Sequence, residues 1–67
     1  MVTGIVSWFD NGQGLGVIRP QYGGKDVFVH ASALRDCGLN SLREGQRVRF
    51  VVADGARGSS AVKIELV

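Results

Sequence analysis

The apolar residues of this chain recur at every second position, which is the period of a β-strand. The clearest case is the segment DVFVH at 26–30, where Val27 and Val29 alternate with Phe28 and His30. No window of about 11 residues carries apolar side chains at the spacing of a helical stripe. The pattern therefore predicts an all-β fold built from short strands.

Residues that favour turns separate the alternating segments. Because Asn and Gly tolerate positive φ, turns are predicted at 10–12, 21–24 and 55–59. The strands between them are predicted at 2–9, 15–19, 26–30, 46–54 and 60–67. A short helical turn is predicted at 32–35 with Ser32 as its cap, and the loop 36–45 is expected to turn Leu42 inward.

The number and spacing of the strands limit the architecture. Five short antiparallel strands, with a long connection between the third and the fourth, fit a small closed Greek-key barrel. Closure removes the unpaired edges that open strands would expose. A chain of 67 residues has room for one core, so we predict a single domain over residues 1–67.

Alternation along each strand also predicts which side chains face the solvent. If the β-branched sets face the core, the inward residues are Ile18, Val27, Val29, Val48, Phe50, Val52, Val62, Ile64 and Leu66. The side chains expected to project together onto the outer surface are Leu15, Val17, Phe28 and His30, with Trp8 beside them. An exposed patch of aromatic and aliphatic side chains indicates a binding surface.

The segment GQGLGVI at 12–18 places glycine at every second position. We interpret it as a strand with one face bare at Gly14 and Gly16. Leu15 and Val17 occupy its displayed face. The segment is not a dinucleotide-binding loop, because the G-x-G-x-x-G spacing is absent and a proline follows where a helix would begin.

Composition and charge add a preference for an anionic partner. The chain is 45% hydrophobic and 21% charged, an ordinary globular balance. Its net charge is +2 and its pI is about 9.2, and six of its eight basic residues are arginines. Arginine stacks on flat rings and binds phosphate with two parallel hydrogen bonds. A solvated arginine-rich surface explains the charge equally well.

Several classes of function lack the residues they need. The chain has one cysteine and one histidine, so neither an internal disulfide nor a metal cluster is expected, and the cysteine indicates a reducing compartment such as the cytoplasm. A dyad of Cys37 and His30 would lack an orienting partner, so no catalytic residue, cofactor or small-molecule substrate is predicted. No apolar run approaches about 18 residues and no export signal precedes the first strand, so no membrane association is predicted.

Exposed aromatic rings surrounded by cations bind single-stranded nucleic acid by stacking on its bases. Core filling is the competing explanation for an aromatic residue, and it is the preferred one for Phe9 and Phe50. For Phe28 and His30 the alternation opposes it, because two valines would have to turn outward.

Three blocks, TGIVSWFDNGQGLGVIRP, KDVFVHASAL and SLREGQRV, resemble the bacterial cold-shock protein family in order and spacing. The resemblance covers essentially the whole chain. It implies a five-stranded barrel of the OB-fold type that binds single-stranded RNA and DNA through motifs on its second and third strands. It also implies a role as an RNA chaperone or as a regulator of transcription or translation, without enzyme activity.

The resemblance also shows where this chain departs from the family. The family's stacking positions correspond here to Trp8, Leu15, Val17, Phe28, His30, Ala31 and Leu39. Four of them hold aliphatic residues where the family has aromatic ones. Ser7 and Gln13 replace lysines and Asp10 replaces an asparagine, whereas Arg35 and Arg57 are basic. Because stacking contributes about 1–3 kcal/mol per base, binding is expected to be weaker than is typical of the family.

Two hypotheses about function follow. The leading one is a cytoplasmic protein that binds single-stranded RNA or DNA, with Phe9 supporting the stacking rings. Its expected site residues are Trp8, Phe9, Gln13, Leu15, Val17, Lys25, Phe28, His30, Arg35 and Arg57. The alternative is a protein-interaction or homodimerising module that uses the aliphatic surface of Leu15, Val17, Ala31 and Leu39.

Overall fold

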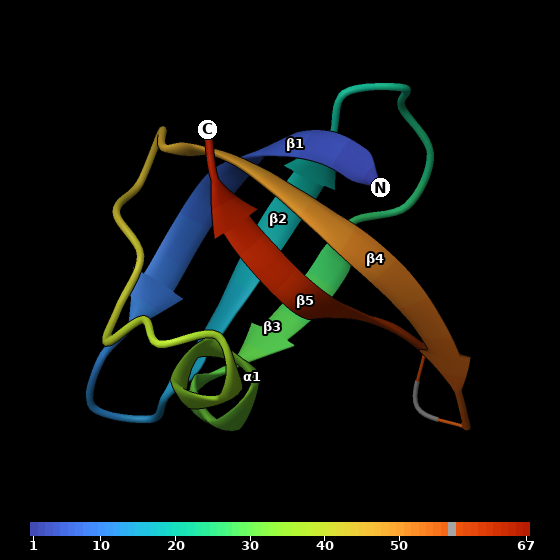
Figure 1. Cartoon of the computed structure of the whole chain (residues 1–67). Helices are drawn as coiled ribbons and strands as arrows, with labels where there is room; N and C mark the ends of the chain where they lie inside the picture. The colour runs from blue at the N-terminus through green and yellow to red at the C-terminus, as the bar shows by residue number, and fades with distance from the viewer. Residues whose placement is uncertain (57) are drawn as a thin grey trace.

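Five strands close into a barrel in the order β1-β2-β3-β5-β4, which confirms the predicted fold class (Figure 1). The computed structural model describes residues 1–56 and 58–67. Its elements are β1 (Val2–Asp10), β2 (Leu15–Pro20), β3 (Val27–His30), α1 (Ala31–Asp36), β4 (Arg47–Gly55) and β5 (Gly58–Leu66). In Figure 1, α1 lies at one end of the barrel and both ends of the chain lie at the other.

All neighbouring strands are antiparallel except β3 and β5, which are parallel and meet at the pair Phe28 and Ser60. A closed ring of five strands cannot alternate direction throughout, because five is an odd number. One parallel pair is therefore unavoidable, and the prediction of purely antiparallel strands is wrong at this seam. The connection through α1 and residues 37–46 carries the chain along the side of the barrel, from the end at α1 to the start of β4 at the other end, and β5 then returns beside β3 (Figure 1).

Apolar side chains from every strand and from α1 fill the barrel. The buried cluster consists of Val6, Ile18, Val27, Val29, Leu34, Leu42, Val48, Phe50, Ala61 and Ile64. Phe50 is the largest fully buried side chain, which confirms it as a core residue. Leu42 is also buried, as predicted for the loop after α1. No buried polar side chain occurs among the described residues, so burial of apolar surface is the main source of stability.

Strand β5 departs from the predicted alternation. Leu66, which was expected to face the core, is 49% exposed. Ala61 and Ile64 are both buried although they are three positions apart, and Lys63 between them has a positive φ of 51°. A left-handed residue breaks the two-residue period, so the inward residue before it is Ala61 rather than Val62, whereas Ile64 after it faces inward as predicted. Val62 is consequently only half-buried.

The helix α1 begins one residue earlier than predicted, and its cap is His30 rather than Ser32. The side chain of His30 accepts a hydrogen bond from the backbone N–H of Ser32, which is one of the N–H groups left unpaired at a helix start. The helix buries Leu34 against the barrel. In the part of the chain that the structure describes, no helix is long and apolar enough to cross a membrane.

Candidate nucleic-acid interface

Three side chains form a row across the outer surface of the barrel. In the strand register, Trp8 of β1 lies directly opposite Val17 of β2, and Val17 lies directly opposite Phe28 of β3. The row continues to Ser60 of β5, the parallel partner of Phe28. Trp8 is 45% exposed and Phe28 is 47% exposed. Two aromatic rings therefore stand in solvent on either side of an aliphatic residue.

A β-bulge turns Trp8 outward. The register of β1 against β2 shifts between Val6 and Trp8, so that Ser7 has no partner in the pairing. Strict alternation from the buried Val6 would point Trp8 into the core and Phe9 into solvent. The extra residue reverses this order, which leaves Trp8 exposed and Phe9 packed against the core. Trp8 was predicted to lie in the exposed patch, but the apolar pattern of the sequence does not reveal the bulge that turns it outward.

Val17 does not stand exposed as predicted. Only 8% of its surface is accessible, even though it belongs to the outward row. Its two direct cross-strand partners are Trp8 and Phe28, and the β-carbons of such partners lie about 4.5–5.5 Å apart. The two large rings therefore cover Val17 from both sides. It forms an apolar floor between them rather than a projecting side chain.

Only one of the two glycines predicted to form the bare face of the GQGLGVI segment lies in a strand. Gly14 lies in the turn before β2 and has a φ of 66°, so only Gly16 belongs to the strand. A β-carbon on Gly16 would lie 2.5 Å from Cδ1 of Phe9 and 2.7 Å from the carbonyl oxygen of Trp8. Gly16 is thus the direct partner of Phe9 and leaves space for its ring on the inner side of the sheet. Phe9 supports the surface from within and is only half-exposed.

A second row lies beside the first, toward α1. Asp10, Leu15 and His30 are successive partners across β1, β2 and β3. Leu15 is half-buried, and His30 is exposed at the end of β3. Asp10 accepts hydrogen bonds at Oδ1 from the backbone N–H groups of Gly12 and Gln13, at 2.9 Å and 3.3 Å. These bonds hold the β1–β2 turn in place beside the second row.

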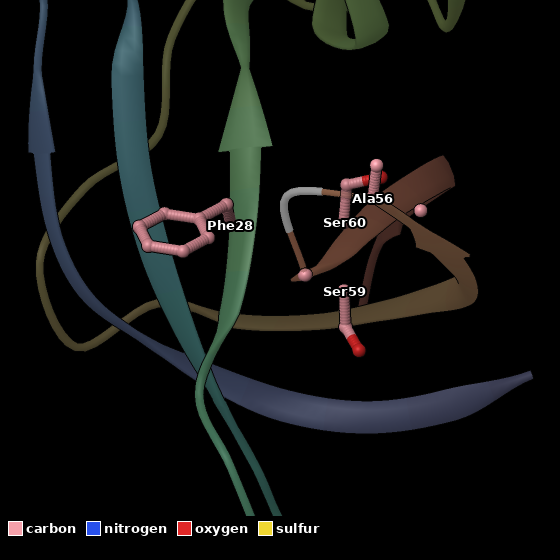
Figure 2. Close-up of a pocket in the computed structure, with 6 residues that line it drawn as sticks. Phe28, Ala56, Ser59 and Ser60 are labelled. Carbon is pink, nitrogen blue, oxygen red and sulfur yellow. The ribbon is translucent and has the colours of Figure 1, made fainter.

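A groove adjoins Phe28 on the side of the β4–β5 hairpin (Figure 2). Its volume is about 530 Å³, and it is lined by Phe28, Gly55, Ala56, Gly58, Ser59 and Ser60. The hairpin residues are small, so the aromatic ring is the largest apolar surface that the groove offers. The sequence predicted only a turn at 55–59, and the small residues Gly55, Ala56, Gly58, Ser59 and Ser60 are its signal of an open surface next to Phe28.

Comparison with known proteins agrees with this arrangement. The family model described as "'Cold-shock' DNA-binding domain" matches residues 2–67. This chain belongs to the cold-shock domain family.

Named relatives cover nearly all of this cold-shock domain. The cold shock-like protein CspA of Bordetella pertussis is 48% identical over 67 residues, which is 100% of each chain. The cold shock-like protein CspE of Escherichia coli K12 is 48% identical over 63 residues, 94% of this chain and 91% of the relative. The cold shock-like protein CspB of Yersinia pestis is 49% identical over 63 residues, 94% of this chain and 90% of the relative.

The polar residues predicted for the site lie around the rows of the cold-shock domain. Gln13 is exposed in the β1–β2 turn, Lys25 is exposed just before β3, and Arg35 is exposed in the last turn of α1. Lys25 and Arg35 therefore lie beyond opposite ends of β3. Within the described ranges 1–56 and 58–67, neither forms an ion pair. Arg57 lies outside the described residues.

The aliphatic surface proposed as an alternative interface is not an exposed face of this cold-shock domain. Val17 is buried, and Leu15, Ala31 and Leu39 are each half-buried. Leu39 packs against the buried core cluster. The exposed apolar area of the first row belongs to Trp8 and Phe28 instead, and rings that stand free in solvent favour stacking over aliphatic packing.

Proposed function

We propose that this protein binds single-stranded RNA or DNA by stacking bases on Trp8 and Phe28. The observation that carries the proposal is the row in which these two half-exposed rings stand on either side of the buried Val17. Neighbouring strands lie about 4.8 Å apart, so the two backbone positions are roughly 10 Å from one another. A base stacks on one face of either ring while its edge contacts the apolar floor at Val17.

Charged and polar residues around the rows bind the nucleic-acid backbone. Lys25 and Arg35 contact phosphates at the two ends of β3, and Gln13 hydrogen-bonds a base edge beside Leu15. We propose the same phosphate-binding role for Arg57 from its charge and position in the sequence. With few cations and two aromatic rings in its first row, the surface has a lower affinity than one with more aromatic residues.

The activity we propose is binding rather than catalysis. Trp8, Val17 and Phe28 of the outward row are apolar and supply neither a nucleophile nor a general base. Stacking on rings tolerates any base, so the protein binds sequences broadly and keeps single strands from pairing. An RNA chaperone, or a regulator of transcription or translation in the cytoplasm, is the role that follows from such binding.

The test is a titration followed by tryptophan fluorescence, because Trp8 is the only tryptophan in the chain. A single-stranded pyrimidine oligonucleotide in low salt is expected to quench the emission with saturation. A blunt duplex of the same sequence is the control, since its bases are already stacked on one another. Unchanged emission up to tens of micromolar single strand would contradict the proposed function.

A further inference from the structure

His30 makes an unusual pair of contacts at the junction of β3 and α1. The backbone N–H of Ser32 donates to Nδ1 of the His30 ring at 3.0 Å. The hydroxyl Oγ of Ser32 lies 2.9 Å from the same nitrogen. The ring is exposed on its other side, next to Leu15 in the second row. One edge of the imidazole is therefore held by the helix start, and the other faces solvent.

These contacts decide which ring nitrogen carries the proton. A backbone N–H only donates, so Nδ1 of His30 must present a lone pair. A neutral imidazole that lacks a proton at Nδ1 carries it at Nε2. Nε2 lies on the far edge of the ring from the helix start. His30 thus presents a single N–H donor to solvent and has no free acceptor there.

We infer that Ser32 is a positioning residue that fixes the tautomer of His30, so that His30 recognises nucleic acid as a directed hydrogen-bond donor as well as a stacking ring. This inference rests on the proposed function. The donor at Nε2 binds an acceptor oxygen of the strand, on a base carbonyl or on a phosphate. The hydroxyl and the N–H of Ser32 both lie within hydrogen-bond distance of Nδ1, so Ser32 contributes to recognition through His30.

The same geometry gives His30 two separable roles, which two substitutions distinguish. Serine is a strong helix cap but is too short to stack or to reach the strand. His30→Ser therefore keeps the start of α1 and loses both the ring and the donor. His30→Phe keeps a ring for stacking but loses the cap and the donor. Both variants lose the donor, so comparing them separates the contribution of the ring from that of the helix start.

The first measurement is the tautomer of His30, read from the ¹⁵N shifts of its ring near neutral pH. The expected pattern is an unprotonated Nδ1 and a protonated Nε2, with the Nε2 proton protected from exchange when oligothymidylate is added. A ring protonated mainly at Nδ1 would overturn the inference. An Nε2 proton that exchanges equally fast in the free and bound protein would overturn it as well.

The second measurement is affinity, from Trp8 quenching at a temperature well below the melting midpoint of every variant. Losing the donor and the cap while keeping the ring, in His30→Phe, is expected to weaken oligothymidylate binding by about 2- to 10-fold. Losing ring and donor in His30→Ser is expected to weaken it by more than about tenfold, at unchanged melting temperature. Wild-type affinity in His30→Phe would overturn the donor role. If the unchanged protein itself fails to bind, the proposed function fails instead.

Two further comparisons complete the design. Ser32→Ala removes Oγ but keeps the backbone N–H that donates to Nδ1, so the Nε2-protonated form is expected to stay dominant while the ring loses one of its two contacts and the affinity falls. Ser32→Thr is expected to restore the affinity. Unchanged affinity in Ser32→Ala would remove the Ser32 side chain from its positioning role. Oligodeoxyadenylate, whose bases have no carbonyl, identifies the acceptor. A loss in His30→Phe confined to oligothymidylate assigns the donor to a base carbonyl, and an equal loss with both strands assigns it to phosphate.

Discussion

Val17 and Phe28 are direct partners across β2 and β3, yet only 8% of Val17 is exposed against 47% of Phe28. The difference arises because Val17 occupies the middle of its row, with Trp8 on its other side. Substituting Phe28 therefore changes a ring that is exposed for stacking, whereas substituting Val17 changes the apolar floor between Trp8 and Phe28.

Replacing the floor with a ring is expected to strengthen binding. Val17→Phe adds a third aromatic side chain between Trp8 and Phe28, and stacking contributes about 1–3 kcal/mol per base. Titration of the variant with a pyrimidine oligonucleotide should show an affinity at least about fivefold higher. Val17→Ile is the control, because it enlarges the side chain without adding a ring. Equal affinities for the two variants would contradict stacking at this row.

The substitution of phenylalanine by alanine is expected to lower nucleic-acid affinity at Phe28 and folding stability at Phe50. Phe28→Ala removes a half-exposed ring and should lower affinity by about 1–3 kcal/mol with little change in the free energy of unfolding. Phe50→Ala removes a fully buried ring and should lower the free energy of unfolding by about 3–5 kcal/mol. Urea unfolding and Trp8 titration, measured on both variants, check the pair. A small domain has little stability to lose, so Phe50→Ala should be largely unfolded.

Gly16 is expected to tolerate no side chain. In Gly16→Ala the new β-carbon would lie 2.5 Å from the Phe9 ring and 2.7 Å from a backbone oxygen, so the strands must shift. Overpacking of this kind costs about 1–3 kcal/mol of unfolding free energy. Gly55→Ala is the matched control, because its β-carbon would make an ordinary contact at 3.7 Å. Equal melting temperatures for the two variants would show that Phe9 does not lie over Gly16.

Phosphate contacts predict a dependence of affinity on salt. Each phosphate neutralised on a single strand contributes about −0.7 to the slope of log affinity against log salt. Arg35→Gln is expected to make this slope shallower by about that amount. Arg49→Gln is the control with the same change in net charge, because Arg49 is engaged with Glu65 at 2.9 Å, away from the two rows. Identical slopes for the two variants would place Arg35 outside the binding surface.

The fold class followed from the sequence because it depends on a property that repeats in every strand. The alternation of Val27 and Val29 with Phe28 and His30 survives in the structure residue by residue. The core positions Ile18, Val48 and Phe50 were predicted on the same basis and are buried. Because the alternation recurs in every strand, a local irregularity in one strand did not change the predicted fold class, although it made the predicted details of that strand wrong.

Local irregularities explain what the sequence did not predict. The bulge at Ser7 and the positive φ of Lys63 each shift a strand by one position, which reverses inside and outside across the irregularity. Val62 was misplaced for this reason, whereas Leu66 has the same parity as the buried Ile64 and is exposed at the end of β5. Val17 was misplaced because its burial depends on the two rings beside it in space, which are distant in sequence. The capping role of His30 likewise depends on the ring's orientation, which no spacing reveals.

The single parallel pair of Phe28 with Ser60 places the proposed site at the seam where the barrel closes. The groove beside Phe28 takes one wall from β3 and the other from the β4–β5 hairpin, so its two walls meet only where β5 pairs with β3. Trp8 and Phe28 lie on β1 and β3, so Phe28 is the ring that the row shares with the groove.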